Sequence, residues 1–347
     1  FFLGKGLEIS APIAFPALGG VFSERAGVVN IALEGIMTVT SLTLVWGAIA
    51  FQSIWMGLLV AVVTGMLMGL LHAVVTITFK VDHVVSGVAI NVFAIGLTRF
   101  VCQSAFGQET QSAINSRSFP TLLGINSVAW WLVPVGLLSW FIINRTVFGL
   151  RLRSIGERPE AAATLGLSVT AYRTLGVLVS GALAGLAGAW LASEQHSFTD
   201  GMTGGRGYIA LAAMIVGKWS PFGAALACLL FGAAEALQIT LQGSAFPNEL
   251  LQTLPYLVTM LALAGFIGEA IMNTVGCRSG GITWSRGATP RVTWKYRMLS
   301  VVSSPLRAMS CAPATASSAT PGNSMRVSRR LRASRSMCSA ILKGLPP

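Results

Sequence analysis

Long apolar runs constrain this chain more than any other feature. A helix needs roughly 20 apolar residues to cross a bilayer core of about 30 Å, and the chain is 53% hydrophobic and only 10% charged. A mean hydropathy of +0.69 agrees with a membrane environment rather than a soluble surface. Hydropathy along the chain predicts an all-α polytopic membrane protein with about 8–10 transmembrane helices, at 7–22, 27–50, 53–79, 84–106, 127–144, 171–193, 207–219, 221–243 and 250–271.

Two of these segments, 7–22 and 207–219, are short for a full span and carry Gly or Pro at their ends. Short, interrupted helices are tolerated in membranes where their free backbone groups are buried in protein or line a cavity. We therefore expect short broken or re-entrant helices at these two places.

The net charge of +12 is unevenly distributed. Residues 1–272 hold 12 basic and 12 acidic residues, whereas residues 273–347 hold 12 basic residues, 13 Ser and no acid. We predict a transmembrane domain over 1–272 with no nucleic acid as partner, followed by a basic, disordered tail over 273–347. A shift of reading frame near residue 270 would give such a composition; the alternative is a polybasic tail attracted to anionic membrane lipid.

The basic residues also predict the orientation, because short loops rich in Arg and Lys stay in the cytoplasm. Loop 145–173 carries five Arg, whereas loop 194–206 carries only Arg206 with two acidic residues. We expect a multi-pass protein of a bacterial or archaeal cytoplasmic membrane, with its N-terminus outside and loop 145–173 and the C-terminus inside.

Cysteine and histidine give no sign of metal or disulfide chemistry. Cys102 and Cys228 lie in apolar runs, and no ligand pair is formed by the histidines, which we interpret as surface or interfacial residues. No catalytic residues are predicted, since no His, Asp, Glu or Ser residues gather at one level as a membrane enzyme would require.

Within loop 145–173, the stretch that begins at Pro159 predicts a short helix. Pro159 suits the first turn, Glu160 complements the helix dipole, and Gly166 allows a left-handed stop. A rigid knob of this kind suits a soluble partner that must grip and move a membrane protein. The alternative is a plain connecting helix.

Three separated stretches resemble one family of transporters: GVFSERAGVVNIALEGIM (20–37), FGLRLRSIGERPEAAATLG (148–166) and GGRGYIALAAMIVGKWSPFGAALACLLFGAAEAL (204–237). Together with LPYLVTMLALAGF (254–266), they are similar to importer permeases of the ATP-binding-cassette (ABC) type, from the branched-chain amino acid, simple sugar and nucleoside family. The resemblance implies a coupling role in loop 145–173 for Arg151, Gly156, Glu157, Pro159, Glu160, Ala161, Ala162 and Gly166.

The resemblance also implies the partners. They are a cytoplasmic ABC ATPase, a second permease subunit, identical or different, and an extracytoplasmic substrate-binding protein. The chain has no G-x-x-x-x-G-K-[ST] motif, so no cofactor is expected in it, and ATP and Mg²⁺ would be used by the partner ATPase. We expect nucleosides as substrate, followed by simple sugars and then branched-chain amino acids. The rival is a stand-alone secondary transporter, which would show a relay of acidic or histidine residues through several spans.

Polar residues within spans are expensive and usually face a pathway or a partner. Two glutamates, Glu34 and Glu235, each follow one of the short segments. The alternative is a set of polar contacts between helices that stabilise the bundle. The candidate substrate-pathway residues are Asn30, Glu34, Asn91, Glu235 and Gln238.

Overall fold

A computed structural model describes residues 2–113, 119–122 and 125–241, and six single residues between 253 and 264. The predicted tail (273–347) and most of the predicted span 250–271 lie outside the described residues.

The regular secondary structure of the described residues is helical apart from a hairpin of two-residue strands, β1 (Thr121–Leu122) and β2 (Ile125–Asn126). The helices are α1 (Phe2–Arg25), α2 (Leu33–Ala50), α3 (Ile54–Ala73) with a π-helical turn η1 (Val74–Thr78), α4 (His83–Phe106), α5 (Ser127–Trp130), α6 (Leu132–Arg145), α7 (Val147–Glu157), α8 (Pro159–Thr164), α9 (Val169–Glu194), α10 (Arg206–Val216) and α11 (Pro221–Leu241).

Seven helical segments of the described chain are long and apolar enough to span a bilayer, which confirms the all-α polytopic prediction. They cover Gly6–Arg25, Leu33–Ala50, Ile54–Thr78, His83–Phe106, Ser127–Arg145, Val169–Glu194 and Pro221–Leu241. An eighth apolar helix, α10, has only 11 residues, about 16 Å at 1.5 Å per residue. The prediction of a short helix near 207–219 is therefore confirmed.

The other predicted interruption is wrong in its position. Helix α1 runs unbroken through Pro12 and Pro16, although proline lacks the N–H that continues a helix. Neighbouring helices compensate for such losses in membrane proteins, and α1 packs on α9, α10 and α11. The break lies instead after Arg25, because the predicted segment 27–50 becomes helical only at Leu33.

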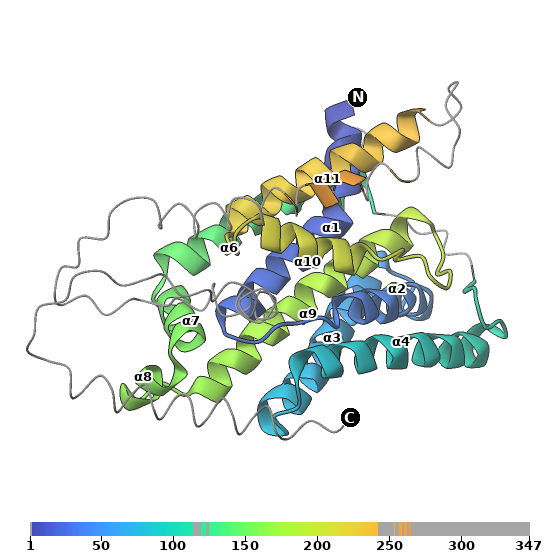
Figure 1. Ribbon diagram of the computed structural model, residues 1–347. Helices are drawn as coiled ribbons and strands as arrows, with labels where there is room; N and C mark the ends of the chain where they lie inside the picture. Colours follow the sequence, from blue (N-terminus) through green and yellow to red (C-terminus); the bar gives the residue numbers. More distant parts are fainter. Residues whose placement is uncertain are drawn as a thin grey trace, which may run out of the picture. The chain divides into compact units, whose positions relative to one another are not determined.

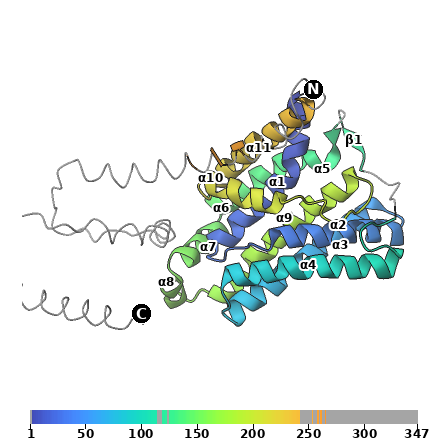
Figure 2. The ribbon, with the colours of Figure 1, turned by 45° about the vertical axis from the view of Figure 1, so that its right-hand side comes forward.

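Helices α1 and α9 form the centre of the bundle (Figure 1), with α2, α3 and α4 on one side and α10 and α11 on the other. Figure 2 shows the same grouping after a 45° turn, with α7 and α8 beside the start of α9. We call this end of the bundle the α8 end. The chain turn between α2 and α3 (residues 51–53) lies at the opposite end.

Glycine allows α3 and α9 to approach closely. A methyl group added to Gly65 would collide with the backbone of α9 at Gly181 and would lie 3.1 Å from Cα of Gly185. Small residues at such crossings allow van der Waals contact between backbones, which stabilises helix pairs in lipid.

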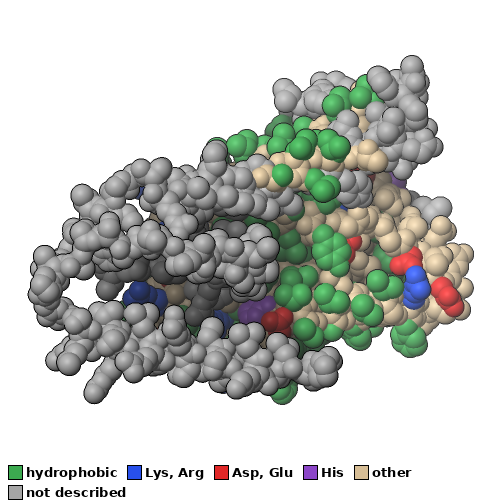
Figure 3. All heavy atoms as spheres, viewed as in Figure 1, with side chains coloured by type: hydrophobic (Ala, Val, Ile, Leu, Met, Phe, Trp, Pro, Cys, Tyr) green, Lys and Arg blue, Asp and Glu red, His purple; other side chains and the backbone are tan. Residues whose placement is uncertain are grey.

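Figure 3 shows hydrophobic side chains spread over the described surface, among other side chains and backbone. Large apolar side chains are exposed along α3, α4 and α6, for example Leu67 (59%), Val92 (65%) and Leu137 (64%). Lipid chains are the natural cover for such a surface.

Candidate functional site

The site is built around two interruptions of the helical bundle: residues 26–32, between α1 and α2, and residues 195–205, between α9 and α10. Non-helical backbone inside a membrane needs partners for its N–H and C=O groups. The N–H groups of residues 26–28 donate to carbonyls at the end of α1, whereas Val29 and the carbonyl of Ile31 find side-chain partners on α3 and α4.

Two histidines hold Val29. Its N–H donates to Nδ1 of His83 (3.1 Å), and its carbonyl lies 3.1 Å from Nε2 of His72. Because a carbonyl only accepts, Nε2 of His72 carries the proton, and Nδ1 accepts from the Ser86 hydroxyl at 3.0 Å. His72 is fully buried, so its interpretation as a surface or interfacial residue is wrong. No sequence pattern indicates this role, because the partner is a backbone group.

Asn30 is fixed in the same way. Its Nδ2 donates to the Ser180 hydroxyl of α9 (2.9 Å), and its Oδ1 accepts from the N–H of Ala32 (3.1 Å). The side chain is fully buried. In this conformation Asn30 therefore fixes the interruption between α1 and α2 to α9.

Glu34 joins the two interruptions. It lies in the first turn of α2, and its two carboxylate oxygens accept from the N–H groups of Gly205 (2.9 Å) and Gly207 (2.7 Å). These N–H groups belong to the first turn of α10, where a negative charge is favourable to the helix dipole. A methyl group on Gly207 would lie 2.6 Å from the backbone nitrogen of Glu34, so only glycine allows this approach.

Asn91 of α4 belongs to the same cluster. We call Glu34, Asn91 and Tyr208, with the neighbouring Arg206 and Glu235, the polar junction. Its Oδ1 accepts from the N–H of Gly35 (2.8 Å), while its Nδ2 donates to the carbonyl of Ile31 (3.1 Å) and to the hydroxyl of Tyr208 (2.9 Å). Asn91 is 6% exposed. One amide thus connects the starts of α2 and α10 to α4.

An ion pair forms part of this junction. Nη2 of Arg206, the first residue of α10, is 2.6 Å from Oε1 of Glu235 on α11. Arg206 lies at the end of the predicted loop 194–206, and this ion pair was not predicted, since hydropathy cannot show that residues 195–205 fold back into the bundle. Gln238 lies half-buried on α11, one turn from Glu235, and makes none of these hydrogen bonds.

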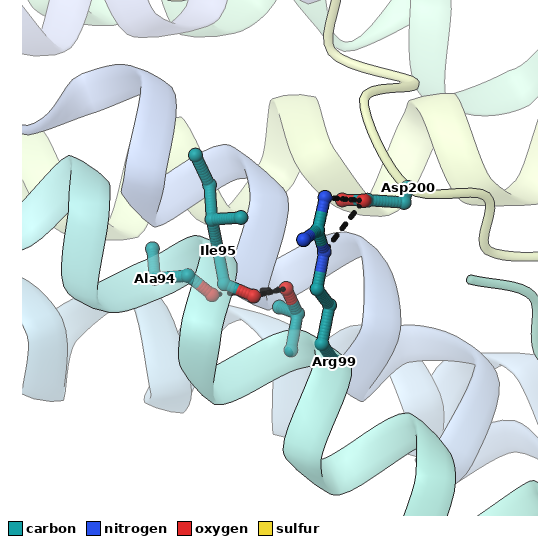
Figure 4. Close-up of polar contacts among 5 residues, drawn as sticks. Ala94, Ile95, Arg99 and Asp200 are labelled. Atoms are coloured by element: carbon teal, nitrogen blue, oxygen red, sulfur yellow. Dashed lines mark hydrogen bonds and ion pairs between the residues drawn. The ribbon is translucent and has the colours of Figure 1, made fainter. Parts of the chain in front are cut away.

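Residues 195–205 are held by contacts to α4 and the segment after it. Asp200 forms an ion pair with Arg99 of α4 at 2.6 Å, as Figure 4 shows, and its N–H donates to the carbonyl of Thr110 (2.8 Å). The N–H of Phe198 donates to the hydroxyl of Ser112 (2.8 Å). The entrance to α10 is therefore anchored at the end of the bundle away from α8.

A second group of predicted residues lies at the α8 end. Helix α8 begins with Pro159 at its first position and is followed by Gly166 at φ +77°, so the predicted short helix is confirmed. Glu157, Glu160 and Ala161 are exposed, whereas Ala162 is 2% exposed. The Ala162 side chain therefore contributes to packing and is not available to a partner.

Helix α7 links α8 to the interruption after α1. A methyl group on Gly156 would collide with the carbonyl of Arg25, and one on Gly27 would lie 3.3 Å from Cα of Gly156. Arg151 donates to the Tyr172 hydroxyl of α9 at 3.1 Å. The α7–α8 unit thus touches α1 and α9 where α1 ends.

The family model described as "Branched-chain amino acid transport system / permease component" matches residues 2–263. The chain belongs to this permease family, which makes it a multi-pass component of a plasma-membrane transport system and not an enzyme. The family resemblance seen in the sequence is confirmed.

The aligned part of this chain covers most of the length of each curated relative. The chain is 40% identical to the guanosine ABC transporter permease protein NupQ of Bacillus subtilis, over 76% of this chain and 91% of that protein. It is also 40% identical to the nucleoside ABC transporter permease protein NupC of Lactococcus lactis, over 76% and 92%. A putative glucose ABC transporter permease protein, TsgC13 of Haloferax volcanii, is 31% identical over 76% and 90%. No solved structure matches the chain.

Proposed function

We propose that this chain is the membrane subunit of an ABC importer that moves nucleosides into the cell. The observation that carries the proposal is the 40% identity to two permeases named for guanosine and nucleoside transport. Simple sugars are the second candidate, supported by the relative named for glucose. Branched-chain amino acids, the substrate in the family's description, come third.

The partners follow from this class. A separate cytoplasmic ATPase would bind and hydrolyse ATP with Mg²⁺, a second permease subunit would complete the membrane unit, and an extracytoplasmic binding protein would deliver substrate. The N-terminus would lie outside, and the α8 end and the C-terminus inside. The five Arg of loop 145–173 support this orientation.

The α7–α8 unit is the proposed contact with the ATPase. Glu157, Glu160, Ala161 and Gly166 are exposed there, and Leu165 beside them is an apolar residue that is 80% exposed. Gly156 and Arg151 connect this unit to α1 and α9, while Pro159 and Ala162 shape α8. Closure of the ATPase would move α8, and the contact of Gly156 with the end of α1 would pass that motion to residues 26–32.

The test is ATP-dependent uptake of a labelled nucleoside by membrane vesicles that contain the chain, its ATPase and its binding protein. Gly166→Pro and Glu160→Lys should abolish or strongly reduce uptake, because one removes the left-handed end of α8 and the other reverses a charge on its exposed face.

Matched controls lie at the opposite end of the bundle. Gly107 also has a positive φ (+71°) and ends α4, and its N–H donates to Gln103 as that of Gly166 does to Ala163, both at 3.0 Å. Gly107→Pro and Glu109→Lys therefore make the same chemical changes away from α8 and should keep uptake. Uptake without the ATPase would instead favour a secondary transporter, and equal loss in both pairs would contradict the coupling role of α8.

A further inference from the structure

Part of the polar junction is open to its surroundings. The side chains of Arg206 and Glu235 are 25% and 18% exposed, and Tyr208 is 48% exposed. Tyr208 lies about 12 Å along α10 from Val216, and Glu235 lies about 21 Å along α11 from Pro221, and these two helix ends are joined by the short turn 217–220. These depths fall well within a bilayer core of about 30 Å.

A charged pair at this depth is not stable against lipid, and such residues face a water-filled pathway or another protein. Tyrosines that anchor a protein at the membrane surface lie at the level of the headgroups. Tyr208 lies too deep for that function. Tyr208 and the adjacent Arg206–Glu235 pair therefore belong to a surface that meets a polar or aromatic partner.

Tyr208 is fixed at its hydroxyl, while the residue as a whole is 48% exposed. Its hydroxyl accepts from Nδ2 of Asn91 (2.9 Å), and Asn91 is itself held by Gly35 and Ile31. An aromatic ring anchored in this way loses little freedom when a flat ligand stacks on it.

The charge of the junction restricts the ligand further. The N-terminus of α10 would attract an anion, but both oxygens of Glu34 already occupy the N–H groups of Gly205 and Gly207. A carboxylate or phosphate on the ligand would meet the negative charge of Glu34 there. The junction is therefore suited to an uncharged ligand with a flat ring and several hydrogen-bonding groups.

We propose that Tyr208 stacks on the base of a nucleoside as it passes this junction, with Arg206 and Glu235 hydrogen-bonding to its polar groups. This inference depends on the proposed function and adds to it a residue that distinguishes among substrates. Because a purine offers a larger ring face than a pyrimidine, Tyr208 would favour purine nucleosides.

The experiment measures vesicle uptake of a labelled purine nucleoside and a labelled pyrimidine nucleoside, each at a concentration that saturates the binding protein. Tyr208→Leu should lower purine uptake roughly tenfold, since stacking on an aromatic ring strengthens base binding, and should lower pyrimidine uptake less. Tyr208→Phe keeps the ring and should retain the purine preference. The control is Phe93→Leu, which deletes a ring that is 51% exposed on α4.

The amount of inserted protein and the basal ATPase activity show whether a variant is intact, and Tyr208→Met provides a second ring-free variant if Tyr208→Leu does not insert. Equal uptake of both nucleosides by the ring-free variants and the wild type would overturn the inference, as would an equal defect in Tyr208→Phe, which would show that only the hydroxyl matters. Failure of the wild type to import any nucleoside would instead overturn the proposed function itself.

Discussion

At the scale of single residues, one carboxylate and one amide connect the starts of two helices. Glu34 accepts from two N–H groups of α10, and Asn91 accepts from α2 while it donates to Tyr208. Hydrogen bonds to charged groups contribute more than neutral ones, about 1.5–3 kcal/mol each. Glu34 is therefore a major determinant of the local geometry.

Glu34→Gln tests this contribution. Glutamine keeps one acceptor oxygen, but its NH₂ group would face an N–H donor, so we expect a loss of roughly 1–3 kcal/mol in the free energy of unfolding. Denaturant unfolding of the detergent-solubilised protein would measure the loss. The control Glu109→Gln changes an exposed residue and should have little effect; similar shifts in the two variants would contradict the role of Glu34.

Gly207→Ala tests the close approach of α2 and α10. The added methyl would lie 2.6–2.7 Å from backbone atoms of Glu34, so the helix starts must separate and the carboxylate must lose a partner. We expect destabilisation of about 1–3 kcal/mol in a thermal-unfolding assay. Gly96→Ala on α4, where nothing lies within 4 Å, should leave stability unchanged or raise it slightly.

The sequence allowed part of this junction to be predicted. Glu34, Asn91 and Glu235 were selected because polar groups within apolar spans are costly and need a reason, and the structure brings these three to the start of α10. The sequence could not show that the side chains of Asn30 and Asn91 form hydrogen bonds within the protein. These hydrogen bonds correspond to the alternative interpretation, that of polar contacts between helices. Arg206 was missed because its depth depends on tertiary folding of residues 195–205.

At the scale of elements, the sequence predicts a helix correctly where residues close to its ends determine where it starts and stops. Helix α8 follows from Pro at its start and Gly beyond its end, which act within a few residues. Segment 7–22 was predicted as a short, broken helix because it is short for a full span and carries Gly or Pro at its ends, yet α1 continues through Pro12 and Pro16. Packing against α9, α10 and α11 outweighs the local cost of these prolines, and a single sequence does not show such packing.

Gly65→Val tests the packing of α3 on α9. Its side chain would collide with the backbone at Gly181, and the helices would have to move apart along their length. We expect a loss of about 1–3 kcal/mol and a lower yield of folded protein after solubilisation, measured by size-exclusion chromatography. Gly136→Val on α6, whose nearest neighbour lies 4.0 Å away, is the matched substitution; an equal loss there would show that valine itself is the cause.

At the scale of the whole molecule, the two ends of the bundle differ in their contacts. The α8 end brings together the end of α1, α7 and α8 and the turn after α10, where Nε of Arg25 donates to the carbonyl of Trp219 (2.9 Å). The opposite end anchors residues 195–205 through Arg99 and Asp200. This Arg99–Asp200 ion pair is partly exposed and contributes only about 0–1 kcal/mol to stability. Its main role is therefore to position residues 195–205 before α10.

The proposed orientation makes a direct prediction about these ends. In a background without the native cysteines, Gln108→Cys and Ala163→Cys add a thiol at exposed positions, one after α4 and one on α8. A membrane-impermeant thiol reagent added to intact cells should label the first variant and leave the second unlabelled until the cells are opened. Because the α8 contact with a cytoplasmic ATPase requires α8 to face the cytoplasm, the reverse labelling pattern would contradict both the orientation and the coupling role. Labelling of both variants in intact cells would contradict the orientation, since α8 would then be accessible from outside.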